Sequence, residues 1–172
     1  MSDIPKNTNK MASSVLYPIS ANPPTWGHAD IMMRAAQKFN KVYWVVASNP
    51  HKPKSKITDD LKIQMMQAYV DFYKLDNVEV LVHSSTIIRL AQQVGANFLL
   101  RGLRNTTDFQ MELELATGNR GIDKNIETIC MFSKPHFATI SSSLVRELLF
   151  LGEKIDQYVH PKVVEILSNS IK

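Results

Sequence analysis

The stretch Tyr17-Pro18-Ile19-Ser20-Ala21-Asn22-Pro23-Pro24-Thr25-Trp26-Gly27-His28 decides the fold that this sequence predicts. It follows an apolar run at residues 15–17 and precedes a segment at 29–39 whose apolar positions recur at nearly helical spacing. We therefore expect a strand, a loop and a helix that opens at residues 25–28. Ligands of open α/β proteins bind at the carboxyl ends of strands, and the first turn of a helix offers unpaired N–H groups to a phosphate. The stretch is therefore predicted to bind a nucleotide.

Apolar runs and helical patterns alternate along the rest of the chain. Strands are expected at residues 14–18, 42–47, 78–82, 97–100 and 127–132. Helices are expected from the opening at 25–28 through 39, and at about 58–73, 85–93, 107–117, 141–151 and 161–167. The continuously apolar run at 42–47 is typical of a strand that is buried on both faces of a parallel sheet. The sequence therefore predicts an α/β, Rossmann-like, doubly wound five-stranded parallel sheet with helices on both faces.

Composition and charge limit the classes of protein to consider. The 172 residues are 44% hydrophobic and 21% charged, which is typical of one folded domain with its own core. The net charge of +4 fits an anionic ligand, but no Lys/Arg stripe indicates nucleic acid. No apolar run reaches the length of a membrane span, and the start lacks the apolar region of a signal peptide. We expect a disordered polar tail at residues 1–12, with Met11 as an alternative start to Met1, and a single domain at 13–172.

The sequence contains one cysteine, Cys130, within the apolar run at 129–132. A single cysteine cannot form an internal disulfide and fits a reducing cytoplasm. We expect a buried core thiol rather than a nucleophile. Trp44, Met65 and Met66 are likewise expected in the core rather than around a ligand.

Polar clusters lie at four of the expected junctions between strands and helices, at residues 20–28, 51–52, 101–104 and 139–143. The carboxyl ends of parallel strands share one edge of a sheet, so these clusters are expected to converge. Arginine, lysine, histidine and hydroxyl side chains together suit phosphate groups. No Walker loop, Gly-x-Gly-x-x-Gly motif or Cys/His metal set is present. The pattern therefore indicates transfer at phosphorus, in which positioning and charge stabilisation supply most of the catalysis.

Each cluster also has a purely structural interpretation. His28 could be a polar residue in the first turn of a helix, and Lys52 could be solvated. Arg101 and Arg104 could form surface salt bridges, although they flank a glycine directly after a buried strand. The serines at 141–143 could cap a helix, a role that is compatible with phosphate binding because both use the same N–H groups.

Taken together, the clusters resemble the phosphopantetheine adenylyltransferases, a family in the nucleotidyltransferase superfamily that carries a T-x-G-H signature. The resemblance covers residues 17 to about 167, and 25–28 supply the signature. The segment most specific to the family is Arg101-Gly102-Leu103-Arg104, followed by Asp108, Phe109 and Glu112; by itself Glu112 would be taken as a solvated acid. A third block follows in the expected order, Ile140-Ser141-Ser142-Ser143-Leu144-Val145-Arg146-Glu147, and Asn119-Arg120 and Lys52-Pro53 also match.

The resemblance implies a reaction. The phosphate of 4′-phosphopantetheine would attack the α-phosphorus of ATP in line, giving dephospho-CoA and pyrophosphate without a covalent intermediate. Mg²⁺ would assist, carried with ATP and without a dedicated set of protein ligands. The resemblance further implies a cytoplasmic enzyme of coenzyme A biosynthesis that forms a homo-oligomer, typically a hexamer.

The resemblance also implies roles for individual residues. His28, Lys52 and Arg101 are the candidate catalytic residues, with His28 on the α-phosphate and the other two on the acceptor phosphate. Ser20 would touch both substrates, and Ile87 would touch the pantetheine arm. The candidate ATP contacts are Ser20, Ala21, His28, Gly102, Leu103, Arg104, Glu112, Phe137, Ala138, Thr139, Ile140, Ser141, Ser142 and Ser143.

The opening loop departs from the family, which usually has Gly-Thr-Phe-Asp-Pro where this chain has residues 19–23. Ser20 keeps the hydroxyl, and Asn22 keeps a side chain that forms turns. Ile19 replaces a glycine that permits positive φ and close approach, and Ala21 removes a large contact, so we expect a reshaped ATP pocket. Residues 22–25 are also close to the loop of nicotinate or nicotinamide mononucleotide adenylyltransferases. Two alternatives therefore stay open: transfer to such a mononucleotide, and an inactive nucleotide-binding paralogue.

Overall fold

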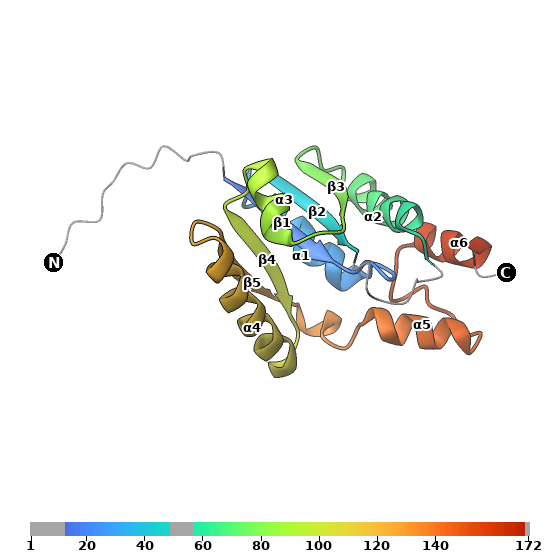
Figure 1. Cartoon of the computed structure of the whole chain (residues 1–172). Coiled ribbons are helices and arrows are strands. Elements are labelled where there is room, and N and C mark those ends of the chain that lie inside the picture. The colour runs from blue at the N-terminus through green and yellow to red at the C-terminus, as the bar shows by residue number, and fades with distance from the viewer. Residues whose placement is uncertain (1–12, 49–56, 171–172) are drawn as a thin grey trace.

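The computed structural model describes residues 13–48 and 57–170. In this part of the chain, strands and helices alternate from the first strand to the fifth, and two further helices follow (Figure 1). The elements are β1 (Ser14–Ile19), α1 (Trp26–Ala36), β2 (Lys41–Ala47), α2 (Asp59–Tyr73), β3 (Val78–His83), α3 (Ile87–Val94), β4 (Phe98–Leu103), α4 (Thr106–Ile122), β5 (Glu127–Phe132), the short 3-10 turn η1 (Pro135–Phe137), α5 (Ser142–Phe150) and α6 (Pro161–Ser170). The expected tail at 1–12 lies outside the described residues, and the single domain stays a prediction.

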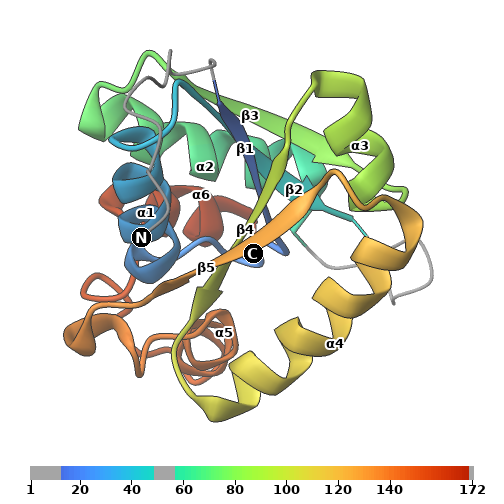
Figure 2. The same ribbon diagram turned by 90° about the vertical axis from the view of Figure 1, so that its left-hand side faces the viewer.

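The five strands form one parallel sheet in the order β3-β2-β1-β4-β5 (Figure 2). The chain moves outward from β1 to β3 and then returns to the other side of β1 with β4. The strand order therefore reverses between β1 and β4, which is where open α/β sheets bind their ligands. The predicted doubly wound parallel sheet is confirmed.

The two faces of the sheet are covered by different helices. Side chains alternate along β1: Val15 and Tyr17 pack into the larger core cluster, which also takes residues from α1, α2, α5 and α6. Leu16 faces the other way, into a smaller cluster with Ile88 of α3. Strand β2 likewise turns Trp44 into the larger cluster and Val45 into the smaller one, so the apolar run at 42–47 is buried on both faces as predicted.

The expected core residues Trp44, Met65 and Met66 are fully buried, as predicted. The expectation of a buried Cys130 is wrong, because its side chain is exposed. Strand β5 is an edge strand, and Ile129 and Met131 alone turn toward the larger cluster, so Cys130 lies on the opposite face. Helix α4, which crosses that face, buries none of its side chains.

Helix α1 begins at Trp26, within the opening expected at residues 25–28, so His28 lies in its first turn. Two other element boundaries differ from the expected ones. Strand β4 continues through Leu103, so Arg101 and Gly102 belong to the strand instead of following it. Helix α4 runs on to Ile122 rather than ending near 117. In the part of the chain that the structure describes, no helix is long and apolar enough to cross a membrane.

Candidate active site

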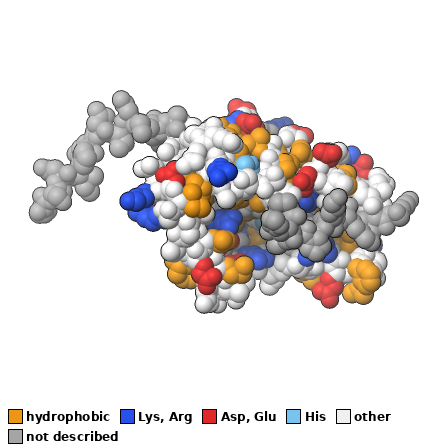
Figure 3. All heavy atoms as spheres, in the orientation of Figure 1, with side chains coloured by type: hydrophobic (Ala, Val, Ile, Leu, Met, Phe, Trp, Pro, Cys, Tyr) orange, Lys and Arg blue, Asp and Glu red, His pale blue; other side chains and the backbone are white. Residues whose placement is uncertain are grey.

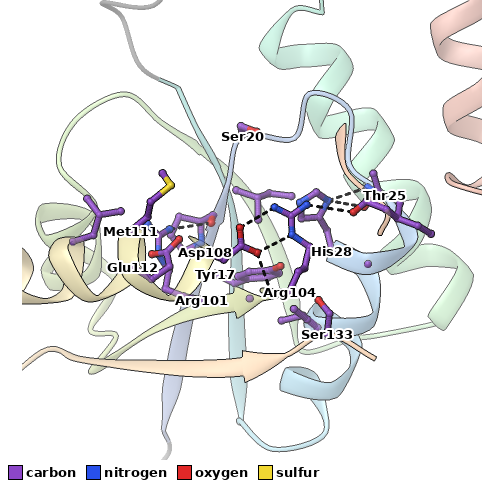
Figure 4. A pocket seen from close by; sticks show the side chains of 17 residues that line it. Tyr17, Ser20, Thr25, His28, Arg101, Arg104, Asp108, Met111, Glu112 and Ser133 are labelled. Carbon is purple, nitrogen blue, oxygen red and sulfur yellow. Dashed lines mark hydrogen bonds and ion pairs between the residues drawn. The ribbon is translucent and has the colours of Figure 1, made fainter. Parts of the chain in front are cut away.

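A cavity of about 410 Å³ lies where the strand order reverses, between the carboxyl ends of β1 and β4. Its walls come from β1, the first turn of α1, β4 and the first turns of α4, and the labelled side chains point into it (Figure 4). The space-filling view shows Lys and Arg side chains within the hollowed middle of one face (Figure 3). The predicted site residues that line the cavity are Ser20, His28, Arg101, Gly102, Arg104, Glu112 and Ile140.

The orientation of the His28 ring is set by the cap of its own helix. Thr25 is the N-cap of α1, and its backbone N–H donates to His28 Nδ1 at 3.1 Å. The Thr25 hydroxyl also lies 2.9 Å from the same nitrogen. A backbone N–H can only donate, so Nδ1 must be the unprotonated nitrogen of a neutral ring. The proton therefore sits on Nε2, which is left as a hydrogen-bond donor in the cavity wall.

The surroundings of His28 keep the ring neutral. Burial, followed by the positive charge of Arg104, lowers the pKa of His28 to about 4. A neutral imidazole with a fixed Nε2–H can donate to an anion at neutral pH without giving up its proton. The neutral ring can therefore stabilise charge on a phosphate through this one hydrogen bond.

Arg101 forms an ion pair with Glu112 across the cavity wall. Its Nε donates to Glu112 Oε2, and its Nη1 lies 3.4 Å from the Pro18 carbonyl oxygen. Both charged side chains are only about one-fifth exposed, at 20% and 21%. Glu112 is therefore a partner that orients a cavity arginine, and the interpretation as a solvated acid is wrong.

Arg104 is held by Asp108 in a two-pronged pair, with Nε to Oδ2 at 2.9 Å and Nη2 to Oδ1 at 3.0 Å. Asp108 also accepts the Arg104 backbone N–H, and its own backbone N–H is capped by Asn105. Burial opposes ionisation of Asp108, but Arg104 outweighs it and holds the pKa of the carboxyl below its usual value. A guanidinium has five N–H donors, so each arginine keeps N–H groups that can bind a phosphate while it pairs with its carboxylate.

The absence of a side chain at Gly102 lets β4 approach α1 closely. A Cβ at this position would lie 2.5 Å from Ile31 Cδ1 and 3.4 Å from the Tyr17 hydroxyl. Tyr17 is buried beneath the cavity, and burial raises the pKa of its hydroxyl, which stays protonated. Gly102 thus allows the two arginines on either side of it to reach the cavity from a tightly packed strand.

The third sequence block is bound to the opening loop. Ser141 caps α5 by accepting the Leu144 N–H at 3.1 Å, so the capping interpretation holds for this serine. The Ser142 hydroxyl donates to the Pro23 carbonyl oxygen at 2.7 Å, and Arg146 Nη1 donates to the Asn22 carbonyl oxygen at 2.6 Å. These two hydrogen bonds join residues that are 119 and 124 positions apart in the chain, and they hold the loop against the start of α5.

The left-handed backbone of the opening loop lies at Ala21 and not at Ile19, where the family usually has glycine. Ile19 is the last residue of β1 and is not among the described residues with positive φ. The left-handed conformation falls at Ala21, whose φ is 48° and whose side chain is fully buried. Ile19 nevertheless lines the cavity, so replacement of a glycine there does add apolar surface to the wall.

The other predicted site residues lie elsewhere. Leu103 and Ala21 are buried, while Phe137 packs against Gly27, where an added Cβ would meet the Phe137 Cβ at 3.5 Å. Ile87 packs with the smaller core cluster. The predicted site residues that do not line the cavity, among the described residues, are Ala21, Ile87, Leu103, Phe137, Ala138, Thr139, Ser141, Ser142 and Ser143. Lys52 lies outside the described residues.

Several cavity residues were not predicted as site residues. Asp108 belongs to the family-specific segment, but Arg104 lies before α4, so helical spacing did not indicate their ion pair. Met111 and Leu115 supply apolar wall from α4. Tyr17 was taken only as the end of a strand, because nothing local distinguishes a buried tyrosine below a site from one in the core.

Asp30 is a buried acid that the sequence analysis did not consider. It pairs with Arg34 at 2.9 Å and with Lys134 at 2.7 Å, and Arg34 also donates to the Phe132 carbonyl oxygen. These contacts tie the end of β5 to α1. They thereby place Ser133, which lines the cavity.

Residues 16–148 match the cytidylyltransferase-like family. The chain is 37% identical to the phosphopantetheine adenylyltransferase of Aliivibrio fischeri (strain MJ11), over 94% of this chain and 99% of that protein. It is 39% identical to the phosphopantetheine adenylyltransferase of Streptococcus pneumoniae (strain Taiwan19F-14), over 91% of this chain and 96% of that protein.

A solved structure shares the fold. It is the nicotinic acid mononucleotide adenylyltransferase of Plasmodium falciparum complexed with NaAD, with a TM-score of 0.66 and 13% identity over 91% of this chain and 95% of that one. At that identity the likeness concerns the fold alone, whereas the curated relatives match in sequence along nearly their whole length. The chain therefore belongs to the phosphopantetheine adenylyltransferases, within the cytidylyltransferase-like family.

Proposed function

We propose that this protein transfers AMP from ATP to 4′-phosphopantetheine and releases pyrophosphate. The observation that carries the proposal is that one cavity joins His28, from the superfamily signature, with Arg101 and Arg104, from the segment most specific to this family. The relatives that are similar over nearly their full length carry the name of this activity. The enzyme is accordingly a nucleotidyltransferase.

In the proposed mechanism His28 acts on the α-phosphate. Its Nε2–H would donate to a non-bridging oxygen, whose negative charge must be stabilised as the phosphorus is attacked. Because Thr25 fixes the ring beforehand, the donor would need no reorganisation during the reaction. A phosphate oxygen of the acceptor forms the new bond to the α-phosphorus, and the bond to the bridging oxygen of pyrophosphate breaks with its electron pair.

The arginines are proposed to hold the phosphates on either side of the reacting phosphorus. Arg101, together with Lys52, would bind the acceptor phosphate, and Arg104 would bind the nucleotide. Ser20, exposed at the end of β1, would contact both substrates. Ile87 and residues 137–143 would supply the remaining substrate contacts that the resemblance implies.

Mg²⁺ is proposed to enter with the phosphates of ATP. The two carboxylates in the cavity wall, Asp108 and Glu112, are both engaged by arginines. Within residues 13–48 and 57–170, no group of three or more His, Cys, Asp or Glu side chains could hold a metal ion. No step above depends on a metal ligand from the protein.

The assay that tests the activity uses the purified full chain with ATP and Mg²⁺, and measures pyrophosphate with three acceptors. These are phosphopantetheine, nicotinate mononucleotide and no acceptor. Release that depends on phosphopantetheine is the expected result. Release only with the mononucleotide would instead support adenylyl transfer to nicotinate mononucleotide, the alternative that the loop at residues 22–25 suggests. Nucleotide binding without release would support an inactive paralogue.

We also propose that the chain forms a homo-oligomer, a hexamer by resemblance, in the cytoplasm. Apolar side chains of α4 and β5 are roughly half exposed or more, namely Phe109, Met111, Leu113, Leu115, Ile122 and Phe132. A second copy of the chain would remove this surface from water. Leu113→Asp should split the assembly, as measured by light scattering, whereas a monomeric parent chain would contradict the proposal.

A further inference from the structure

The peptide group between Pro24 and Thr25 is held at both of its ends. Its N–H is the one that donates to His28 Nδ1. Its carbonyl oxygen accepts a hydrogen bond from the Tyr69 hydroxyl at 3.2 Å. A peptide group is planar and rigid, so the position of its oxygen determines the direction of its N–H. Tyr69 and His28 therefore contact opposite ends of one rigid unit.

The Tyr69 hydroxyl is held in place by a second hydrogen bond. It accepts the backbone N–H of His160, just before α6, at 2.9 Å. The hydroxyl therefore uses its proton on Pro24 and a lone pair on His160. The Tyr69 side chain is fully buried, so both hydrogen bonds are shielded from water. A hydrogen-bonded chain leads from the backbone at His160 through Tyr69 to the His28 ring.

An aromatic cluster keeps this chain in place, and we define it as Trp26, Tyr69, Phe72 and His160. The Trp26 ring meets Tyr69 edge-on at 5.1 Å between centroids and lies 5.6 Å from His160. The Trp26 backbone N–H also donates to the Tyr158 carbonyl oxygen at 3.1 Å. The segment before α6 therefore holds the first turn of α1 at two points, through Tyr69 and through Trp26. Helices α2 and α6 lie side by side here (Figure 1).

We propose that Tyr69 is a positioning residue for His28, whose hydroxyl aims the Thr25 N–H and thereby the Nε2 proton toward the cavity. This inference rests on the transfer reaction proposed above. Tyr69 does not line the cavity and has no contact with substrate to lose. Its removal should therefore affect the chemical step rather than the binding of ATP. Hydrogen-bonded chains also polarise one another, so a lost bond at the carbonyl weakens donation by the N–H.

Tyr69→Phe removes the hydroxyl and keeps the buried ring. We expect kcat to fall at least about tenfold, because misplacement of a catalytic group is costly, while KM for ATP stays within about twofold. The matched control is Tyr73→Phe, one turn further along α2, whose hydroxyl makes no hydrogen bond among the described residues. Its kcat should stay within about twofold of the parent. A Tyr69→Phe enzyme with the kcat of the control would overturn the proposal.

Two further measurements separate positioning from general packing. In the His28→Ala background, Tyr69→Phe should cause no additional loss of kcat, because a residue that acts only through His28 has nothing left to position. An equal loss in both backgrounds would mean that Tyr69 acts through packing alone. Substitution of Tyr69 by 4-aminophenylalanine keeps a donor for Pro24 and should restore most of the turnover. This variant also tests the proposal if Tyr69→Phe does not fold.

The His28 ring can be followed without any substrate. In an NMR titration, the pKa of His28 should rise in Tyr69→Phe relative to the parent and to Tyr73→Phe, since the Thr25 N–H would stabilise the neutral ring less. An unchanged pKa would contradict the inference. If the parent releases no pyrophosphate, the proposed reaction fails, and this titration still decides the role of Tyr69.

Discussion

Asp108 holds the Arg104 guanidinium in the cavity wall through two parallel N–H to oxygen bonds of 2.9 and 3.0 Å. The pair joins the end of β4 to the first turn of α4, and Arg104 Nη1 further reaches the Ile140 carbonyl oxygen at 3.4 Å. An arginine fixed in this way loses little freedom when a phosphate arrives, so more of its interaction energy remains for binding.

Arg104→Lys should therefore raise KM for ATP by about tenfold, because an ammonium cannot pair with both Asp108 oxygens and also present a flat face to a phosphate. Steady-state kinetics with varied ATP measure the effect. The control is Arg120→Lys, in an ion pair with Glu127 whose side chains are 61% and 56% exposed. If both variants have the parent's KM, Arg104 does not bind the nucleotide.

The fixed ring of His28 leads to a prediction about rate. His28→Ala should lower kcat at least about a hundredfold, as expected for the loss of one preorganised donor to the transition state. The ring is already neutral well below neutral pH, since its pKa is about 4. The parent's kcat should therefore show no inflection from His28 between pH 6 and 8. Near-normal turnover in His28→Ala would refute the role.

His28 also links folding stability to pH. Its pKa is about 4 in the folded protein and near the ordinary 6.5 when unfolded, so between these values the unfolded chain binds more protons. The stability is fully present above pH 6.5 and falls as the pH drops toward 4, by up to about 3 kcal/mol. His28→Asn should lose less stability over this interval.

Urea unfolding at pH 7, 5.5 and 4.5 would measure the difference between the parent and His28→Asn. Burial also lowers the pKa of His160, which has the same sign of effect, but this contribution is common to both proteins and cancels in the comparison. Equal losses of stability in the two proteins would mean that His28 is not buried as a neutral ring.

The sequence predicted the sheet and the convergence of its polar clusters because both follow from local patterns. A continuous apolar run identifies a central strand, and strand ends of a parallel sheet must share one edge. Cys130 shows the limit of such patterns. Its apolar neighbours resemble those of a buried strand, but its exposure depends on β5 being an edge strand, which only the strand order reveals.

The contacts within the site depended even more on tertiary structure. The sequence placed both arginines, but it did not show that each is oriented by a carboxylate of α4. Tyr69 and the His160 N–H that fixes it are 91 positions apart, and no pattern connects them. The left-handed backbone of the opening loop lies at Ala21 rather than at Ile19, because the chain ends its regular strand before it turns.

The close approach at Gly102 leads to a prediction about packing. In Gly102→Ala the new methyl group would meet Cδ1 of the buried Ile31 side chain at 2.5 Å. Overpacking of this kind should destabilise the fold by about 1–3 kcal/mol. Ile31→Val removes the clashing atom, so it should cost less in the Gly102→Ala background than alone, with a coupling of about 1 kcal/mol.

Gly118→Ala is the control for Gly102→Ala. Nothing lies within 4 Å of a Cβ at this position of α4, so the substitution should be neutral or stabilise the helix by about 0.5–1 kcal/mol. Urea unfolding at pH 7 of the parent, the three single variants and the Gly102→Ala/Ile31→Val double variant gives the free energies of unfolding that are needed. If Gly102→Ala is as stable as the parent, Ile31 can move aside, and the approach of β4 to α1 does not require glycine. If it is destabilised but Ile31→Val restores nothing, the methyl group meets the Tyr17 hydroxyl instead, the next atom at 3.4 Å.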